Sequence, residues 1–270
     1  MNMFLEIFQY GFVLRAFEAG IVVAAIAPLI GIFLVLKRYS LIADTFSHVS
    51  LAGIAAGFLM GINPVLSALV FTVIASFGIE KLRGSKKVYG ESALAIFLSG
   101  ALALAVVIIS LAHGFNTNLY NYLFGSIVTI TSFDVYMISA LAAVVATVLI
   151  LFYKEIVYIS FDEESAKASG IPVKMINGIL ILLTAITVSM AIPTIGVLLI
   201  SALIVIPVVA ALQLRQSFLK TIFFAQAISV FSVASGRFAS FYFNISTGGT
   251  IVLIMLAIFL VVFLWNRGKI

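Results

Sequence analysis

Long apolar runs separated by short polar connections make up most of this chain. A helix that crosses a bilayer needs about 20 mainly apolar residues, because the hydrocarbon core is about 30 Å thick. Nine runs approach that length and predict spans over residues 16–36, 41–61, 64–80, 92–112, 133–152, 175–191, 195–212, 221–240 and 248–265. Turn-forming pairs at Asn63–Pro64 and Pro193–Thr194 divide the two longest apolar stretches. The pattern predicts an all-α polytopic bundle of eight to nine transmembrane helices, as one transmembrane domain over residues 1–270.

Two segments do not fit the pattern of spans. The first fifteen residues place Phe4, Phe8 and Phe12 at helical spacing, which predicts an amphipathic segment at the membrane interface. Residues 120–129 are apolar but too short to span. They fit either an aromatic anchor at the interface or a short re-entrant helix packed within protein near the outer mouth.

Basic residues lie in alternate connections between the predicted spans. The basic connections contain Lys37, Arg38, Lys81, Arg83, Lys86, Lys87, Lys154, Lys167, Lys174, Arg215, Lys220, Arg267 and Lys269. The other connections carry no Lys or Arg. Because cytoplasmic loops are enriched in Lys and Arg, the basic connections and the C-terminus are predicted inside and the N-terminus outside.

Composition supports a membrane protein and excludes several activities. Charged residues make up 9% of the chain and hydrophobic residues 64%, whereas a soluble domain carries about 25% charged residues. With no cysteine, the chain can form neither disulfides nor thiolate metal sites. The basic residues are too scattered for a nucleic-acid footprint. No P-loop or hydrolase signature occurs, so we predict no enzymatic activity, and an ATP-driven function would need a separate ATPase.

One ionisable pair stands out within the second predicted span. Asp44 and His48 are four residues apart, so they lie on one face of a helix about one turn apart. An aspartate inside the membrane costs about 2.5–3.5 kcal/mol on insertion scales and is usually functional. A carboxylate next to an imidazole can bind a divalent transition-metal ion, so this pair is a candidate metal site. The alternative is a buried hydrogen bond that simply joins helices.

The neighbouring face of the same span carries Gly53, Gly57 and Gly61. Small residues at this spacing let another helix approach closely, so the Asp–His pair is predicted to face protein rather than lipid. Two ligands do not complete a site. A two-fold dimer would bring two pairs together and give an N2O2 set that suits a four-coordinate ion.

Residues 160–170 read as a short, well-delimited cytoplasmic helix. Ser160 and Glu163 fit a capping box, and Asp162, Glu163 and Glu164 form an acidic first turn. Gly170 is expected to end the helix in a left-handed conformation. This is the conspicuous acidic patch on an otherwise basic face, so it is a plausible docking element for a soluble partner.

Other polar residues in the spans have ordinary structural interpretations. Arg237 is predicted to snorkel from a helix end, and Gln226 to form an interhelical hydrogen bond. Pro207 is expected to remove one backbone hydrogen bond and to kink its helix. His113 is expected in an exposed loop.

Together these segments resemble the permease subunits of bacterial ABC importers for zinc, manganese and iron. The resemblance covers nearly the whole chain and is most specific at residues 40–53, which include the family's Asp-x-x-x-His region, and at residues 160–170 and 193–207. It implies a multi-pass protein of the bacterial cell membrane that forms a homodimer. It also implies two cytoplasmic ATPase subunits, an extracytoplasmic metal-binding protein, and no permanently bound cofactor.

The resemblance also assigns roles to residues. It implies that Asp44 and His48 line the ion path and that residues 160–170, including Ala166 and Gly170, contact the ATPase. The amino-acid sequence of residues 47–53 and 122–130 is closest to that of the zinc branch, so zinc is the predicted ion, with manganese or iron as alternatives. An ATP-independent cation transporter would need more ionisable residues in the spans. An intramembrane metalloenzyme would need a third ligand and a catalytic base.

Overall fold

The computed structural model describes residues 10–84, 90–112, 117–125, 129–243 and 245–267. Within these ranges the chain is helical, and its helices are α2 (Gly11–Leu36), α3 (Leu41–Met60), α4 (Pro64–Gly84), α5 (Gly90–Leu111), α6 (Thr117–Phe124), α7 (Ser132–Leu151), α8 (Tyr153–Phe161), α9 (Glu163–Ala168), α10 (Val173–Ile195), α11 (Val197–Gln213), α12 (Phe218–Phe243) and α13 (Thr247–Arg267). The predicted all-α class is confirmed.

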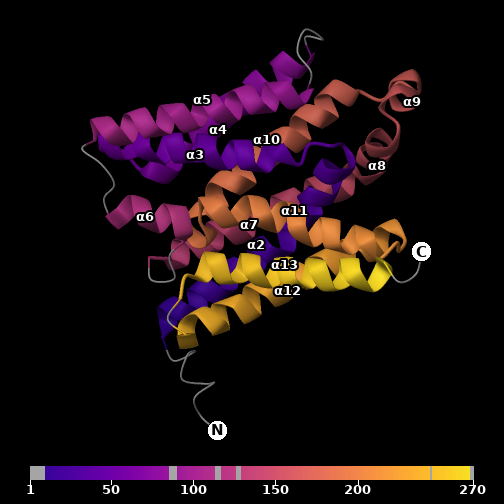
Figure 1. Ribbon diagram of the computed structural model, residues 1–270. Helices are drawn as coiled ribbons and strands as arrows, with labels where there is room; N and C mark the ends of the chain where they lie inside the picture. Colours follow the sequence, from indigo (N-terminus) through magenta and orange to yellow (C-terminus); the bar gives the residue numbers. More distant parts are fainter. Residues whose placement is uncertain (1–9, 85–89, 113–116, 126–128, 244, 268–270) are drawn as a thin grey trace.

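The long helices form two packed groups joined by α10 (Figure 1). In one group α3 packs against α4 and α5, and in the other α11 and α12 pack against each other and against both α2 and α13. Helix α10 contacts α3 and α4 on one side and α2 and α11 on the other. The short helices α8 and α9 lie at the same end of the bundle as the C-terminus, and α6 lies at the opposite end. By the positive-inside rule the α8–α9 end is cytoplasmic.

The lengths of the helices match the predicted spans. In the described part of the chain, eight helices are long and apolar enough to cross a membrane, and α11, at 17 residues, is a shorter apolar helix. The prediction of eight to nine spans is confirmed. The central helices α2, α3 and α10 are mostly buried, whereas α5, α7 and α13 expose most of their apolar residues. In a bilayer those exposed apolar faces would contact lipid or another protein.

The first span begins earlier than predicted. Helix α2 starts at Gly11, so residues 11–15 belong to the span rather than to an interfacial segment. Arg15 lies in its first turns and donates from Nε to the carbonyl oxygen of Ile130 at 3.0 Å. Ile130 lies just before α7 and is 115 positions away from Arg15, so the partner that accepts this hydrogen bond could not be found from the local sequence. Phe4 and Phe8 lie outside the described residues.

The break between the spans of residues 175–191 and 195–212 was predicted at Pro193–Thr194 and is at Gly196. Helix α10 continues through Pro193 to Ile195, and Gly196 then takes φ +92°. A left-handed conformation strongly favours glycine, whereas proline is tolerated in a membrane helix when its neighbours satisfy the freed carbonyl. The predicted turn was therefore three residues too early.

Gly196 packs directly against the end of α6. A Cβ atom added to Gly196 would lie 2.5 Å from the amide nitrogen of Gly125, and one added to Gly125 would lie 2.6 Å from the carbonyl carbon of Ile195. Gly125 also has positive φ, at +75°. Residues 117–124 thus form a short helix packed on α10 and α11, which agrees with the helix of the second interpretation; residues 126–128 lie outside the described residues.

The polar residues within the long helices gave mixed outcomes. The interhelical hydrogen bond of Gln226 is confirmed, since its Nε2 donates to the carbonyl of Ala25 on α2 at 3.1 Å. Pro207 lies inside α11. His113 lies outside the described residues.

The prediction for Arg237 was wrong. Its side chain is 2% exposed and lies above Gly20 of α2, where an added Cβ would approach the guanidinium carbon to 2.3 Å. Its Nη2 is 3.4 Å from the carbonyl oxygen of Thr194, near the end of α10. Gly20 provides the space for the guanidinium, so the arginine is held inside the protein instead of extending to the interface.

Candidate functional site

The glycine face of α3 sets the position of the candidate metal pair. Cβ atoms added to Gly53 and Gly57 would lie 2.6 Å from the Cα of Ala68 and 2.8 Å from the Cα of Pro64 on α4. The predicted close approach of a second helix is therefore present, and α4 is that helix. Gly61 ends α3 in a left-handed conformation with φ +69°.

Asp44 and His48 lie on the same side of α3, as their spacing predicted. The Nε2 atom of His48 is 3.8 Å from Oδ1 of Asp44, and the two side chains are 21% and 41% exposed, respectively. This distance is too long for a strong hydrogen bond, so each group retains a free coordinating atom. The Nδ1 atom of His48 is buried and makes no hydrogen bond to the described residues.

The buried side of α3 beside this pair is held by hydroxyl groups. The Oγ of Ser50 is 3.0 Å from the Oγ of Ser189 on α10, which is itself 2.6 Å from the Oγ1 of Thr72 on α4. This chain of hydrogen bonds joins three helices and satisfies polar groups that would be costly to leave unpaired. It fixes α3, while the Asp–His pair remains partly open on the other side.

The pair does not form a complete metal site within one chain. Among the described residues, no group of three or more His, Cys, Asp or Glu side chains could hold a metal ion. A transition-metal ion takes four or more ligands, so an ion held by this pair would need further ligands from water, backbone or a second protein surface. The partial exposure of Asp44 and His48 leaves room for such ligands.

The cytoplasmic segment 160–170 is helical in two pieces rather than one. Helix α8 ends at Phe161, and Ser160 donates its hydroxyl to the carbonyl of Ile156 in the last turn of α8. Asp162 is the N-cap of α9, and its Oδ1 accepts a hydrogen bond from the backbone N–H of Ser165 at 2.9 Å. The predicted capping box of Ser160 and Glu163 is thus wrong, because α8 already uses Ser160.

The end of α9 is as predicted. Gly170 has φ +82°, its N–H donates to the carbonyl of Lys167, and the N–H of Ile171 donates to the carbonyl of Ala166. These two bonds satisfy the last carbonyls of the helix and make α9 a rigid turn with defined ends. The hydrogen bonds from Ser165 lower the pKa of the Asp162 carboxyl below its ordinary value.

The segment exposes some of the residues predicted for ATPase contact and buries one. Asp162, Glu164 and Gly170 are exposed, and Glu163 is partly buried. Ala166 is 0% exposed, so its side chain packs inside this chain. The surface available to a partner is therefore the acidic side of α9 together with its C-terminal turn.

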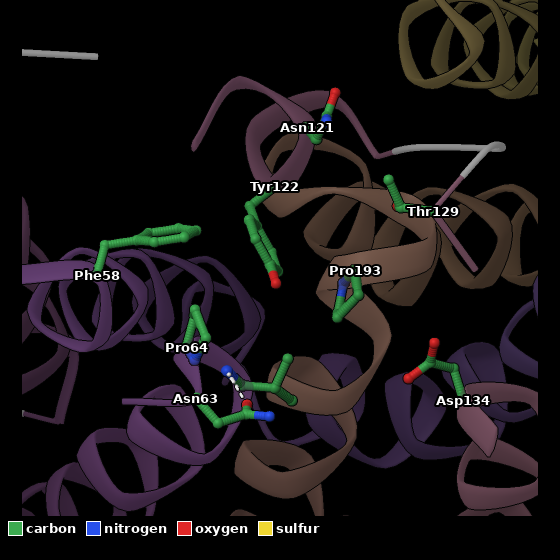
Figure 2. A pocket seen from close by; sticks show the side chains of 9 residues that line it. Phe58, Asn63, Pro64, Asn121, Tyr122, Thr129, Asp134 and Pro193 are labelled. Carbon is green, nitrogen blue, oxygen red and sulfur yellow. Dashed lines mark hydrogen bonds between the residues drawn. The ribbon is translucent and has the colours of Figure 1, made fainter. Parts of the chain in front are cut away.

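A pocket at the opposite end of the bundle was not predicted from the sequence. It encloses about 330 Å³ between the α3–α4 turn, α6, the start of α7 and the end of α10. Figure 2 shows Tyr122 between Phe58 and Pro193, with Asn63 and Asp134 below it on opposite sides of the view. Burial, followed by the charge of Asp134, raises the pKa of the Tyr122 hydroxyl. By the positive-inside rule this pocket faces the outside.

Asp134 is oriented by a capping box at the start of α7. Its Oδ2 accepts a hydrogen bond from the backbone N–H of Thr131 at 2.9 Å, and its own N–H donates to Oγ1 of Thr131 at 3.2 Å. The Thr131-x-x-Asp134 spacing could have revealed the cap from the sequence. The pocket itself brings together segments too distant in sequence to be found that way.

Comparisons with known proteins agree along the whole chain. The ABC 3 transport family matches residues 9–266. The manganese transport system membrane protein MntC of Listeria monocytogenes is 34% identical over 265 residues, which cover 97% of this chain and 94% of that protein. The manganese import system permease protein ScaB of Streptococcus gordonii is 31% identical, with 94% of this chain and 91% of that protein covered.

A solved structure has the same fold. PsaBC from Streptococcus pneumoniae, in complex with Fab, matches with a TM-score of 0.85 and 29% sequence identity, over 97% of this chain and 95% of that one. A match of this extent includes the order and packing of the helices described above. The chain therefore belongs to the ABC 3 transport family and is a multi-pass protein of the bacterial cell membrane.

Proposed function

We propose that the chain is the membrane-spanning permease subunit of an ATP-driven importer of a divalent transition-metal ion. The observation that carries this proposal is the Asp44–His48 pair on α3, partly exposed and with a buried imidazole nitrogen that no described residue satisfies. Family membership supports the transport class. The permease would not catalyse a reaction itself, because ATP hydrolysis would belong to a separate subunit.

We propose manganese as the ion. The relatives MntC and ScaB are named for manganese. Nothing in their names supports the zinc ion predicted from the sequences of residues 47–53 and 122–130. The ligand chemistry is compatible with both ions, since a carboxylate suits manganese and an imidazole suits zinc. Zinc and iron therefore remain the alternatives that a transport assay should include.

In this proposal Asp44 and His48 hold the ion during passage. Asp44 supplies a negative charge that compensates the charge of the cation, and the neutral imidazole of His48 supplies a nitrogen ligand. A second copy of the chain, related by a two-fold axis, would add an equivalent pair. A site shared by two copies would come apart if the copies separated, which suits a transport path better than a permanent metal centre.

The two ends of the bundle would serve different partners. The exposed acidic side of α9 is the proposed contact for an ATPase on the cytoplasmic side. The pocket lined by Asn63, Tyr122 and Asp134 lies at the end that would receive the ion from an extracytoplasmic metal-binding protein. Its polar oxygens suit transient contact with a hydrated cation.

The test is transport by the permease reconstituted in lipid vesicles with its cognate ATPase and binding protein. Manganese, zinc and iron(II) should be supplied separately and in competition, with and without ATP. We expect ATP-dependent accumulation, with manganese preferred. Equal accumulation without ATP would favour an ATP-independent cation transporter. A preference for zinc would reject manganese but retain the rest of the proposal.

A further inference from the structure

A buried lysine connects α9 to the turn that precedes the candidate metal pair. Lys37 follows the last residue of α2, and its side chain is 4% exposed. Its Nζ donates a hydrogen bond to Oδ1 of Asn177 on α10 and lies 3.9 Å from Oε2 of Glu163 on α9. One ammonium group at the end of α2 thus contacts two other helices, α9 and α10.

Glu163 is held on both sides. Its Oε1 accepts a hydrogen bond from Lys167, one turn along α9, at 2.8 Å, while its Oε2 faces Lys37. Burial raises the pKa of the Glu163 carboxyl, but the Lys167 hydrogen bond and the charge of Lys37 outweigh it, so the net pKa lies below its ordinary value. The carboxylate is therefore charged at neutral pH and can pair with a charged lysine.

The turn after Lys37 is closely tied by backbone hydrogen bonds. The N–H of Lys37 donates to the carbonyl of Phe33, and the N–H of Tyr39 donates to the carbonyl of Leu34 at 2.7 Å. Arg38 takes φ 58° to allow this tight reversal. Helix α3 then begins at Leu41, only four positions after Lys37. A displacement of the Lys37 ammonium would therefore be passed to the start of α3 rather than absorbed in a loose loop.

We propose that Lys37 is a positioning residue that transmits movement of α9 to the start of α3, and hence to Asp44 and His48. This inference rests on the proposed function, because it assumes that an ATPase moves α9. The reason for the link is geometric. Along the chain α9 is joined to α8 and α10, so a lateral contact is needed for its motion to reach α3 directly. A buried contact provides that better than an exposed one, since water does not compete for it.

The charges around Lys37 make the link sensitive to pH. The groups that face it are Glu163 and Lys167 on α9, Glu80 and Arg83 on α4, and the Tyr39 ring, whose centroid is 5.3 Å from Nζ. Burial lowers the pKa of Lys37 to about 8, with the charge of Glu163 opposing this shift. The ammonium is therefore present below about pH 8 and is lost as the pH rises through that value. Its charged fraction falls about tenfold between pH 7 and pH 9.

The experiment measures ions transported per ATP hydrolysed by the reconstituted complex. At pH 7 we expect Lys37→Met to lower this ratio severalfold while ATP hydrolysis continues. Lys37→Arg should keep the ratio and should also remove its fall between pH 7 and pH 9, because the guanidinium stays charged. A merely structural role for Lys37 would not produce that difference in the pH profile.

The matched control is Lys81→Met, at an exposed lysine in the last turn of α4. This variant removes a positive charge from the same end of the bundle but no contact between α9 and α2, so the ratio should stay near that of the parent. Glu163→Gln should lower the ratio as Lys37→Met does, and the double variant should lose no more than either single variant. Glu163→Gln also keeps the inference testable if Lys37→Met fails to assemble, because Glu163 is partly exposed and its replacement is less disruptive.

The outcomes separate this inference from the proposed function. If the parent complex transports no metal with ATP, the proposed function fails. If the parent transports normally and both Lys37→Met and Glu163→Gln keep its ratio at pH 7, the role of Lys37 is rejected. An equal loss in Lys81→Met would also reject it, since the effect would then come from the positive charge at this end of the bundle and not from the contact of Lys37 with Glu163.

Discussion

The apolar helices carry ionisable groups in two places that the protein treats in opposite ways. Asp44 and His48 on α3 are 3.8 Å apart and remain 41% and 21% exposed. Arg237 on α12 is 2% exposed, and its Nε and Nη1 atoms make no hydrogen bond to the described residues. Asp44 and His48 lie close to each other and have partly exposed side chains. Arg237 is almost fully buried, and only part of its guanidinium has a hydrogen-bond partner among the described residues.

This difference separates a site that can exchange ligands from a group fixed in the packing. Removing a charge from an accessible pair should change binding more than folding. Removing the charge of Arg237, which packs against Gly20 and lies over the Phe17 ring, should change folding more than transport. Burying a charge is costly unless it is paired, so Arg237 is held by the shape of its surroundings. The following predictions test this contrast, from the largest effect on transport to the smallest.

The largest effect is expected from Asp44→Asn. The amide keeps the shape of the side chain but removes the charge that compensates a cation, so metal uptake should fall by more than the ~10–100-fold loss typical of outer-shell changes around a metal. Thermal stability and co-purification of the ATPase should stay near the parent values. Parental uptake at limiting metal would show that Asp44 is a structural residue, as in the alternative interpretation.

A smaller loss is expected from His48→Ala. Asp44 would still attract the ion, so we expect uptake to fall about tenfold rather than to vanish, corresponding to about 1.4 kcal/mol of lost binding. Because nitrogen ligands favour zinc more than manganese, zinc should lose more uptake than manganese. The measurement is competitive uptake of the two ions by the variant and the parent. An equal loss for both ions would argue against direct coordination by His48.

The third prediction concerns Gly20 and Arg237, where stability should change and transport should not. In Gly20→Ala the new methyl group would overlap the guanidinium, whose carbon lies 2.3 Å from an ideal Cβ. Overpacking of this kind costs about 1–3 kcal/mol. Adding Arg237→Met to Gly20→Ala should restore much of the loss, because a thioether chain can yield.

Thermal unfolding of the four proteins in this double-mutant cycle measures the coupling between Gly20 and Arg237. Uptake by Arg237→Met alone is the control for function and should equal that of the parent. Lost uptake with unchanged stability in that variant would reverse the contrast and place Arg237 in the transport path.

The sequence was sufficient for features that depend on local pattern. Apolar runs located the spans because the bilayer fixes their length, and the i, i+4 spacing placed Asp44 and His48 on one face. The left-handed Gly170 was also predictable, since a glycine followed closely by Pro172 is a strong local stop signal.

Features that depend on where a neighbouring helix ends, or on distant segments, were missed for a physical reason. Two capping residues, Ser160 and Asp162, lie two positions apart, and the extent of α8 decided between them. The buried position of Arg237 required the space above Gly20, which comes from another helix. The sequence predicted two residues of the candidate site and no more, and among the described residues no group of three or more His, Cys, Asp or Glu side chains could hold a metal ion.

The contact between Gly125 and Gly196 has a consequence for how such proteins can diversify. Backbone atoms, rather than side chains, fix α6 over the outer end of the bundle. A library of substitutions should find these two glycines nearly intolerant of change, while the pocket-lining side chains that α6 presents, Asn121 and Tyr122, stay free to vary. The side chains of a helix held by its backbone can change while the position of the helix stays the same. One fold could then adapt its outer surface to different extracytoplasmic metal-binding proteins.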